Sequence, residues 1–194
     1  MKQILMFILI CSAISNCFAN DSLKVVPKKS FDMLQIKTDS VNFLEIVTCG
    51  NYVYFPFGFN QKREEPVLQV LNHFADSIVN YPNADTVLRF HSLKYRSSQL
   101  LLFFDNDPEA SVSLYILKGQ ILDKSIPFSN GIHIGMTIES FLKKFFNRFP
   151  NRWVSNLEKI VFDSCVEGIK HIYCFSNHRL VQIRFEPVGI VFKI

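Results

Sequence analysis

The chain has 194 residues, of which 48% are hydrophobic, and its 21 Lys and Arg against 17 Asp and Glu give a formal net charge of +4. Such a length suits one domain or two small domains that share a sheet. The small positive excess gives no reason to expect nucleic acid as a partner, and no apolar run approaches the length that spans a bilayer.

The N-terminus has the order of a secretory signal peptide. Lys2 is followed by an apolar run from Ile4 to Ile10 and by small and polar residues up to Ala19. The run is too short to cross a bilayer, and "CFA" at 17–19 has the small-x-small form of a cleavage site. We therefore expect a secreted bacterial protein that lacks residues 1–19 and is periplasmic, outer-membrane-associated or extracellular.

The same segment allows a second use, because "ISNC" at 14–17 loosely resembles the lipobox before an acylated cysteine. Asn16 stands where a lipobox has a small residue, which favours simple cleavage. Contact with a membrane is expected only if Cys17 is lipidated.

Residues 20–40 are polar, include "VVPKKS" and show little periodicity. This composition is typical of a leader that is flexible or packed only at its end. Beyond the leader, "VNFLEIVTCG" and "NYVYF" supply one or two strands.

One segment of the chain occurs twice. Superposing "PF" at Pro56 and Phe57 on "PF" at Pro127 and Phe128 gives an offset of 71 residues. At this offset apolar residues recur at i, i+3, i+4 and i+7, the stripe of an amphipathic helix. The pairs are Val67 with Ile138, Val70 with Phe141, Leu71 with Leu142 and Phe74 with Phe145.

Start and stop signals support both helices. Thr137 is placed to cap the second helix, with Glu139 in its first turn, and Pro66 suits the first turn of the other. Pro82 and Pro150 lie just past the two helices, where proline cannot continue them.

After the helices the match resumes at an offset of 58 residues. "LFFD" at 102–105 matches "IVFD" at 160–163, and "SLYIL" at 113–117 matches "HIYCF" at 171–175. A third strand follows in each unit, "QILDKSI" after a "KG" turn and "RLVQIRF" after a "SNH" turn. The longer connection of the first unit leaves "TVLRFHSLKYR" for an extra strand, and the tail "VGIVFKI" supplies the last one.

Alternating apolar and polar residues in these strands indicate an antiparallel sheet with one buried face. The sequence therefore predicts an α+β fold, an antiparallel sheet covered on one face by two helices, from two repeated helix-strand-strand-strand units. The division is a signal peptide (1–19), a polar leader (20–40), a first half-unit (41–126) and a second half-unit (127–194). Each half-unit buries too little alone, so one joined domain is expected.

The second unit resembles a known family. "GMTIESFLKKF" at 135–145, followed by a strand hairpin ending "YCFSNHRLVQIRF", is similar to the unit of the small envelope proteins related to the SmpA/OmlA lipoproteins. Two such units in tandem resemble the β-lactamase inhibitor protein, and the likeness covers residues 52–185. The resemblance implies a concave sheet face that grips a protein partner, as an inhibitor, an immunity protein or an assembly factor, and thus binding rather than catalysis.

Four aromatic residues are the predicted partner-binding site. Tyr115 and Tyr173 occupy equivalent positions in the two units, next to Phe103 and Phe175. Aromatic side chains on an open sheet face bury a large area at little entropic cost. The alternative is a place in the core, because the turn at 166–168 permits two hairpin registers that put Tyr173 on opposite faces. The richness in phenylalanine favours the core.

Cys49, Cys165 and Cys174 remain after cleavage, and export permits a disulfide. Three pairings are open, each with one thiol left over. The histidines lack the spacing of metal ligands and no CxxC accompanies them, so no metal and no cofactor are expected; they are His73, His91, His133, His171 and His178.

No nucleotide-binding or hydrolase motif occurs, which favours a protein that is not an enzyme. Two alternatives to protein binding stay open. One is an envelope hydrolase with Cys49 or Cys165 as thiolate and His133 or His171 as base. The other is a carrier of lipid or a small ligand in a cleft between sheet and helices.

A basic cluster lies along and just after the second helix, at Lys143, Lys144, Arg148 and Arg152. It suits an anionic membrane surface or an acidic partner. A solvated outer helix face explains it as well, and we favour that interpretation.

Overall fold

The computed structural model describes residues 25–54, 56–57, 71–83, 86–104, 114–126, 128–165 and 168–187. The expected signal peptide and lipidation site, the tail strand "VGIVFKI" and the start of the first expected helix lie outside the described residues.

The described strands form two sheets. Nine strands make the main sheet, in the order β2-β3-β9-β10-β11-β7-β6-β5-β4, and β1 pairs with β8 in a small second sheet. The strands of the main sheet are β2 (Met33–Ser40), β3 (Phe43–Thr48), β4 (Ala75–Asn83), β5 (Thr86–Tyr95), β6 (Ser98–Phe104), β7 (Leu114–Ile121), β9 (Lys159–Ser164), β10 (Ile169–Ser176) and β11 (Arg179–Pro187). The remaining elements are β1 (Val26–Pro27), β8 (Phe146–Arg148) and the helices α2 (Asn51–Tyr54), α4 (Ile138–Phe145) and α5 (Asn151–Asn156).

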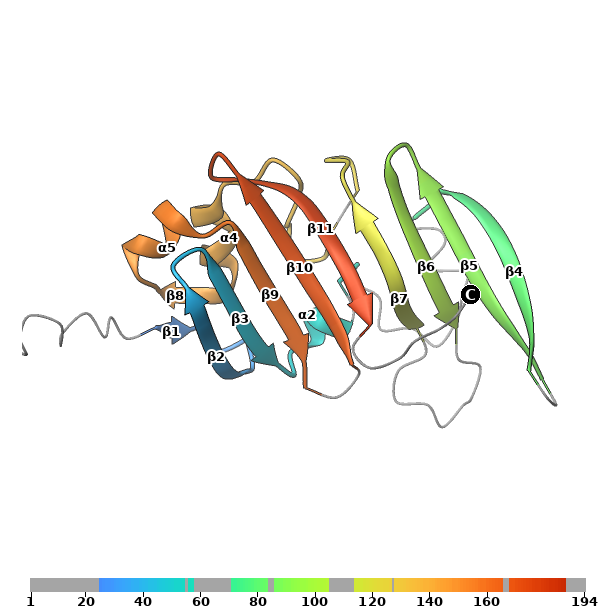
Figure 1. Cartoon of the computed structure of the whole chain (residues 1–194), viewed down its shortest axis with the longest axis horizontal. Helices are drawn as coiled ribbons and strands as arrows, with labels where there is room; N and C mark the ends of the chain where they lie inside the picture. The colour runs from blue at the N-terminus through green and yellow to red at the C-terminus, as the bar shows by residue number, and fades with distance from the viewer. Residues whose placement is uncertain are drawn as a thin grey trace, which may run out of the picture.

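The main sheet is one broad, twisted layer. Figure 1 shows α4 and α5 gathered at the end of the sheet that holds β9 and β10, while β4 to β7 extend away from them. Strands β3 and β9 pair in parallel, whereas the other described strand pairs of the sheet are antiparallel. The pair Ile183↔Ile121 between β11 and β7 joins strands of the two repeated units in this sheet.

The expected α+β sheet covered by two helices is wrong. The described part is mostly β, with 55% strand and 13% helix, and its large sheet is mixed. Residues 75–81, which precede Pro82 and were expected to end the first helix, lie in the edge strand β4. Ile78, Val79 and Tyr81 are residue types that favour strands, and the helical stripe ends before them at Phe74.

The prediction for the second helix is confirmed in α4. The Thr137 side-chain oxygen accepts a hydrogen bond from the backbone N–H of Ser140 at 3.2 Å, so Thr137 is the N-cap. The expected apolar stripe is buried; it consists of Ile138, Phe141, Leu142 and Phe145. The helix ends at Phe145 and not just before Pro150 as expected, because the next residues form β8 and pair with β1, and Pro150 is the N-cap of α5.

The "KG" turn expected at Lys118 and Gly119 is also wrong, because β7 runs straight through it. A Cβ atom at Gly119 would lie 2.6 Å from the carbonyl oxygen of Gln99. The glycine therefore permits a close approach of β6 and β7 rather than a turn. Strand β5, in contrast, is the extra strand expected from "TVLRFHSLKYR", and it pairs with β6.

Two N-terminal expectations also need correction. Residues 33–40, assigned to a polar leader, form the edge strand β2, which pairs with β3. Residues 51–54, the start of the expected strand "NYVYF", form the short helix α2. The strand expected in "VNFLEIVTCG" is confirmed as β3.

The core lies between α4 and one face of the sheet, which we call the inner face; the opposite side is the outer face. The ring of Phe141 lies 4.6 Å from that of Tyr173, and the ring of Phe145 lies 4.6 Å from that of Phe162. Phe31, just before β2, adds a ring 4.9 Å from Phe145. This aromatic cluster holds the helix on β9 and β10.

Candidate functional site

The structure separates the four aromatic residues of the predicted binding site. Tyr173 is 0% exposed and Phe175 is 6% exposed, and both lie on the inner face beneath α4. Phe103 and Tyr115 lie half-buried on the outer face, with ring centroids 6.1 Å apart. Tyr173 and Phe175 are therefore core residues, and only Phe103 and Tyr115 share the face that α4 leaves uncovered.

Hairpin register explains the separation. Phe103 pairs directly with Tyr115 between β6 and β7. In the second unit the residue equivalent to Phe103 is Val161, which pairs with Ile172 rather than with Tyr173. Because side chains alternate along a strand, this difference of one residue turns Tyr173 to the other face.

The outer face of β4 to β7 carries a row of cross-strand neighbours. Val79 pairs with Phe90, Phe90 with Phe103, and Phe103 with Tyr115. The ring of Phe90 lies 5.5 Å from that of Phe103. The sequence did not place Val79 in this row, because its segment was expected to be helical.

Strand β4 is the end of the sheet. Ile78 and Val79 are 46% and 42% exposed and, as consecutive strand residues, point to opposite faces. Asp76 is the only charged residue of this strand, and its Oδ2 lies 2.8 Å from Nδ1 of the buried His91. The edge thus presents apolar side chains and has no lysine, which natural edge strands often use to prevent pairing.

A buried polar network lies under α2. The hydroxyl of Tyr173 donates a hydrogen bond to the hydroxyl of Tyr52 at 2.8 Å and lies 3.4 Å from Nδ1 of His171. Burial lowers the pKa of His171 to about 3 and raises the pKa values of both tyrosines. The network is therefore neutral at physiological pH, and its Tyr173–Tyr52 hydrogen bond joins β10 to α2.

Acidification is expected to destabilise the fold through His171. The folded-state pKa lies below that of an unfolded histidine, about 6.5, so the stabilisation is complete above pH 6.5 and declines as the pH falls toward 3. Between pH 7.5 and pH 5 the free energy of unfolding should fall by about 2 kcal/mol from this group. Urea denaturation at both pH values measures the loss. His171→Leu should flatten the dependence, whereas the exposed His178→Gln should keep it; equal profiles for the two variants would contradict the assignment.

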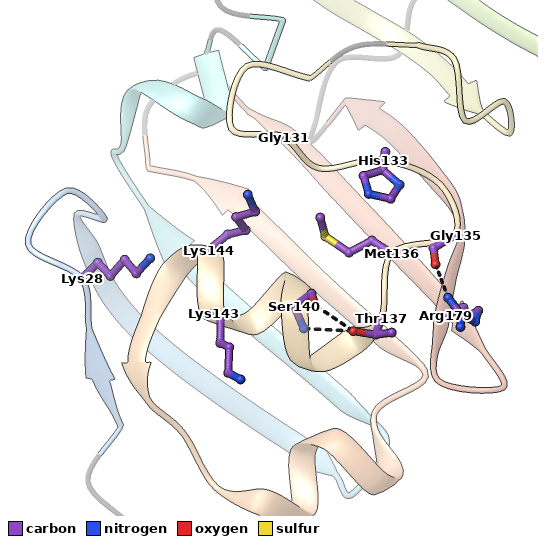
Figure 2. A pocket seen from close by; sticks show the side chains of 10 residues that line it. All are labelled: Lys28, Gly131, His133, Gly135, Met136, Thr137, Ser140, Lys143, Lys144 and Arg179. Carbon is purple, nitrogen blue, oxygen red and sulfur yellow. Dashed lines mark hydrogen bonds between the residues drawn. The ribbon is translucent and has the colours of Figure 1, made fainter.

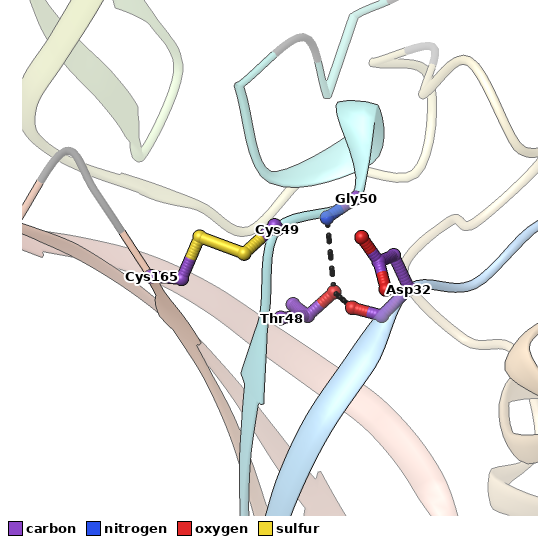
Figure 3. Close-up of a disulfide and its surroundings, with 5 residues drawn as sticks. All are labelled: Asp32, Thr48, Cys49, Gly50 and Cys165. Atoms are coloured by element: carbon purple, nitrogen blue, oxygen red, sulfur yellow. Dashed lines mark hydrogen bonds between the residues drawn. A yellow bond between two sulfur atoms is a disulfide. The ribbon is translucent and has the colours of Figure 1, made fainter.

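Two of the cysteines form a disulfide. Cys49 and Cys165 are bonded, with Cα atoms 5.2 Å apart, where β3 and β9 end side by side (Figure 3). Next to the bond, the Thr48 hydroxyl donates to the carbonyl oxygen of Asp32 at 2.5 Å and accepts from the Gly50 N–H at 3.1 Å. Neither disulfide cysteine has a thiolate for the hydrolase alternative, and Cys174 is the free cysteine of the three.

A groove of about 680 Å³ runs beside α4 (Figure 2). The residues that resemble the SmpA/OmlA motif, Gly135, Met136 and Thr137, line one end of it. The other lining residues are mostly basic or small: Lys28, Gly131, His133, Ser140, Lys143, Lys144 and Arg179. We call this hollow the basic groove.

Backbone hydrogen bonds hold the motif against β11. The Gly135 N–H donates to the carbonyl oxygen of Leu180 at 2.7 Å, and the Leu180 N–H donates to that of Met136 at 2.8 Å. Arg179 Nη1 donates to the Gly135 carbonyl oxygen at 2.9 Å. Gly135 has φ +91°, a conformation that favours glycine. The motif glycine is therefore explained by local geometry.

Other chemistry finds little support in the described part of the chain. No group of three His, Cys, Asp or Glu side chains there is placed to hold a metal ion, and the expectation of a protein without a metal stays a prediction. No helix there is long and apolar enough to cross a bilayer.

Comparisons with known proteins find no matching family model, no matching curated protein and no matching solved structure. The resemblance to SmpA/OmlA-like proteins and to the β-lactamase inhibitor protein therefore stays a prediction from the sequence.

Proposed function

We propose that the protein is an exported cell-envelope protein that binds another protein through the outer face and the free edge of strands β4 to β7. The observation that carries this proposal is the edge strand β4, which exposes Ile78 and Val79 and pairs with another strand on one side only among the described residues.

The backbone of such an edge suits an extended partner segment. Its N–H and C=O groups on the free side are a template for an added strand, and Ile78 and Val79 offer apolar contacts on either side of that strand. Phe103 and Tyr115 lie half-buried farther along the same outer face, beyond the buried Phe90, and aromatic residues are good anchors at interfaces.

The disulfide supports export. A bond between Cys49 and Cys165 persists in oxidising compartments such as the periplasm and is rare in the cytosol. This agrees with the signal peptide expected at residues 1–19.

A lysine at the edge is expected to block binding. Val79→Lys places a charge where the partner strand would pack, so crosslinked capture of the partner from native envelopes should fall at least about 10-fold. Val181→Lys is the matched control, because Val181 is equally exposed, at 42%, but lies on the interior strand β11. Equal capture by both variants, with unchanged melting temperatures, would refute the edge as the binding site.

A further inference from the structure

Basic side chains from other parts of the chain lie beside the lysines of α4. Lys28, Lys143, Lys144 and Arg179 line the basic groove, and Lys143 also borders an adjoining hollow that Arg148 lines. Among the described residues that line the two hollows, Glu139 is the one carboxylate, and it pairs with Lys143 at 2.5 Å. The surface is therefore strongly positive although the whole chain carries only +4.

Three separate parts of the chain bring these cations together. Lys28 follows β1, and its backbone N–H donates to the carbonyl oxygen of Phe145 at 2.8 Å, at the end of α4. In Figure 2 the side chain of Lys144 points toward Gly131. A Cβ atom at Gly131 would lie 3.2 Å from the Lys144 Nζ, so the glycine leaves room for the ammonium group.

The spacing of the cations fits a charged surface better than a single small anion. Arg179 lies at the N-terminal end of α4 and Lys144 in its last turn, and a helix of eight residues is about 12 Å long. Arg148 lies beyond that, in β8. A small anion needs cations that converge on one point, whereas these basic side chains are spread along the length of the helix.

We propose that this basic surface, formed by Lys28, Lys143, Lys144, Arg148 and Arg179, docks on the phosphate groups of anionic lipid headgroups at a membrane surface. Clusters of four to eight Lys and Arg bind such surfaces, because each contributes a modest attraction. The proposal does not depend on the protein-binding edge, which lies at the far end of the sheet from α4 (Figure 1).

The course of the N-terminal segment supports a membrane over an acidic protein as the occupant. Val26 in β1 pairs with Arg148, so the chain enters the fold beside the basic surface. Val25 lies eight positions after Cys17, so the two residues are at most about 29 Å apart. Lipidation of Cys17, the alternative to its removal with residues 1–19, would hold the basic surface within that reach of the bilayer, and one acyl chain needs a second signal such as a polybasic patch for stable anchoring.

Vesicle binding tests the proposal on protein purified after export, with Cys17→Ser in all samples so that no lipid is attached. Lys28→Gln with Lys144→Gln should weaken binding to phosphatidylglycerol vesicles about 30-fold, since each lysine near an anionic surface is worth about a factor of five. The control pair Lys94→Gln with Lys118→Gln has the same change in charge, at exposed positions on β5 and β7, and should bind like the parent. Binding should weaken as salt is added.

Four results would overturn the proposal: no binding of the parent to anionic vesicles, equal binding to phosphatidylcholine vesicles, equal losses in the two variant pairs, or full competition by millimolar inorganic phosphate. Tighter binding of polyglutamate than of vesicles, lost in the Lys28 and Lys144 pair, would show an acidic polypeptide as the occupant instead. Unchanged circular dichroism of the variants excludes unfolding as the cause.

Discussion

Replacing Cys49 and Cys165 with serine is expected to lower the free energy of unfolding by about 4 kcal/mol. The bond spans 116 residues of sequence and joins the ends of β3 and β9, a parallel pair that no short hairpin connects. Without the bond the unfolded chain gains the conformational entropy that closing this loop removes. For a chain of this size the melting temperature should fall by roughly 10 °C.

Cys174→Ser is the control, because it makes the same chemical change at the free cysteine. Its melting temperature should stay close to that of the parent protein, and reductant should lower the melting temperature of both proteins that keep the bond. If Cys174→Ser destabilised the protein as much as the double substitution, the pairing of the cysteines would be different from the one in the structure.

Local signals in the sequence were sufficient for α4 and for several strands. The stripe from Ile138 to Phe145 and the cap at Thr137 depend only on residues within one helix, so they were readable without tertiary information. Strands β3 and β5 were likewise readable from β-branched and aromatic runs.

The errors have a common physical cause, because they concern properties that depend on distant parts of the chain. Strand β4 was read as the end of a helix, since the stripe ending at Phe74 and the proline at Pro82 suggested one continuous element. The parallel pairing of β3 with β9, and with it the choice of Cys49 for Cys165, depends on residues more than a hundred positions apart. Such non-local contacts have no signature within a sequence window.

In the candidate sites, too, residues that are close in sequence were recognised and residues brought together only by folding were not. Lys143, Lys144, Arg148 and Arg152 were recognised as a cluster because they are neighbours in sequence, but Arg152 lines a different hollow, together with Phe43 and Trp153. Lys28 and Arg179 were not recognised, since only folding brings them to the basic groove. Of the four predicted aromatic residues, Phe103 and Tyr115 lie on the outer face. Val79 lies on the same face because of the register of β4 with β5.

Tyr173→Ala is expected to destabilise the protein by about 4 kcal/mol, the range for removing a large aromatic ring from a core. Tyr173 is 0% exposed, and the centroid of its ring lies 4.6 Å from that of Phe141 and 5.2 Å from that of Phe162. Loss of the ring therefore leaves a cavity under α4. The substitution also leaves the Tyr52 hydroxyl without its hydrogen-bond donor. Chemical denaturation of the purified variant measures the change.

Tyr173→Phe separates the ring from the hydroxyl. It keeps the contacts with Phe141 and Phe162 and should cost only about 1 to 2 kcal/mol, for the hydrogen bond to Tyr52 and the contact with His171. A Tyr173→Ala variant as stable as the parent would mean that the β9–β10 hairpin has the other register. Tyr173 would then face outward beside Tyr115, and the partner-binding surface would extend across both units of the repeat. A large loss for Ala and a small one for Phe would exclude Tyr173 from the proposed partner-binding surface.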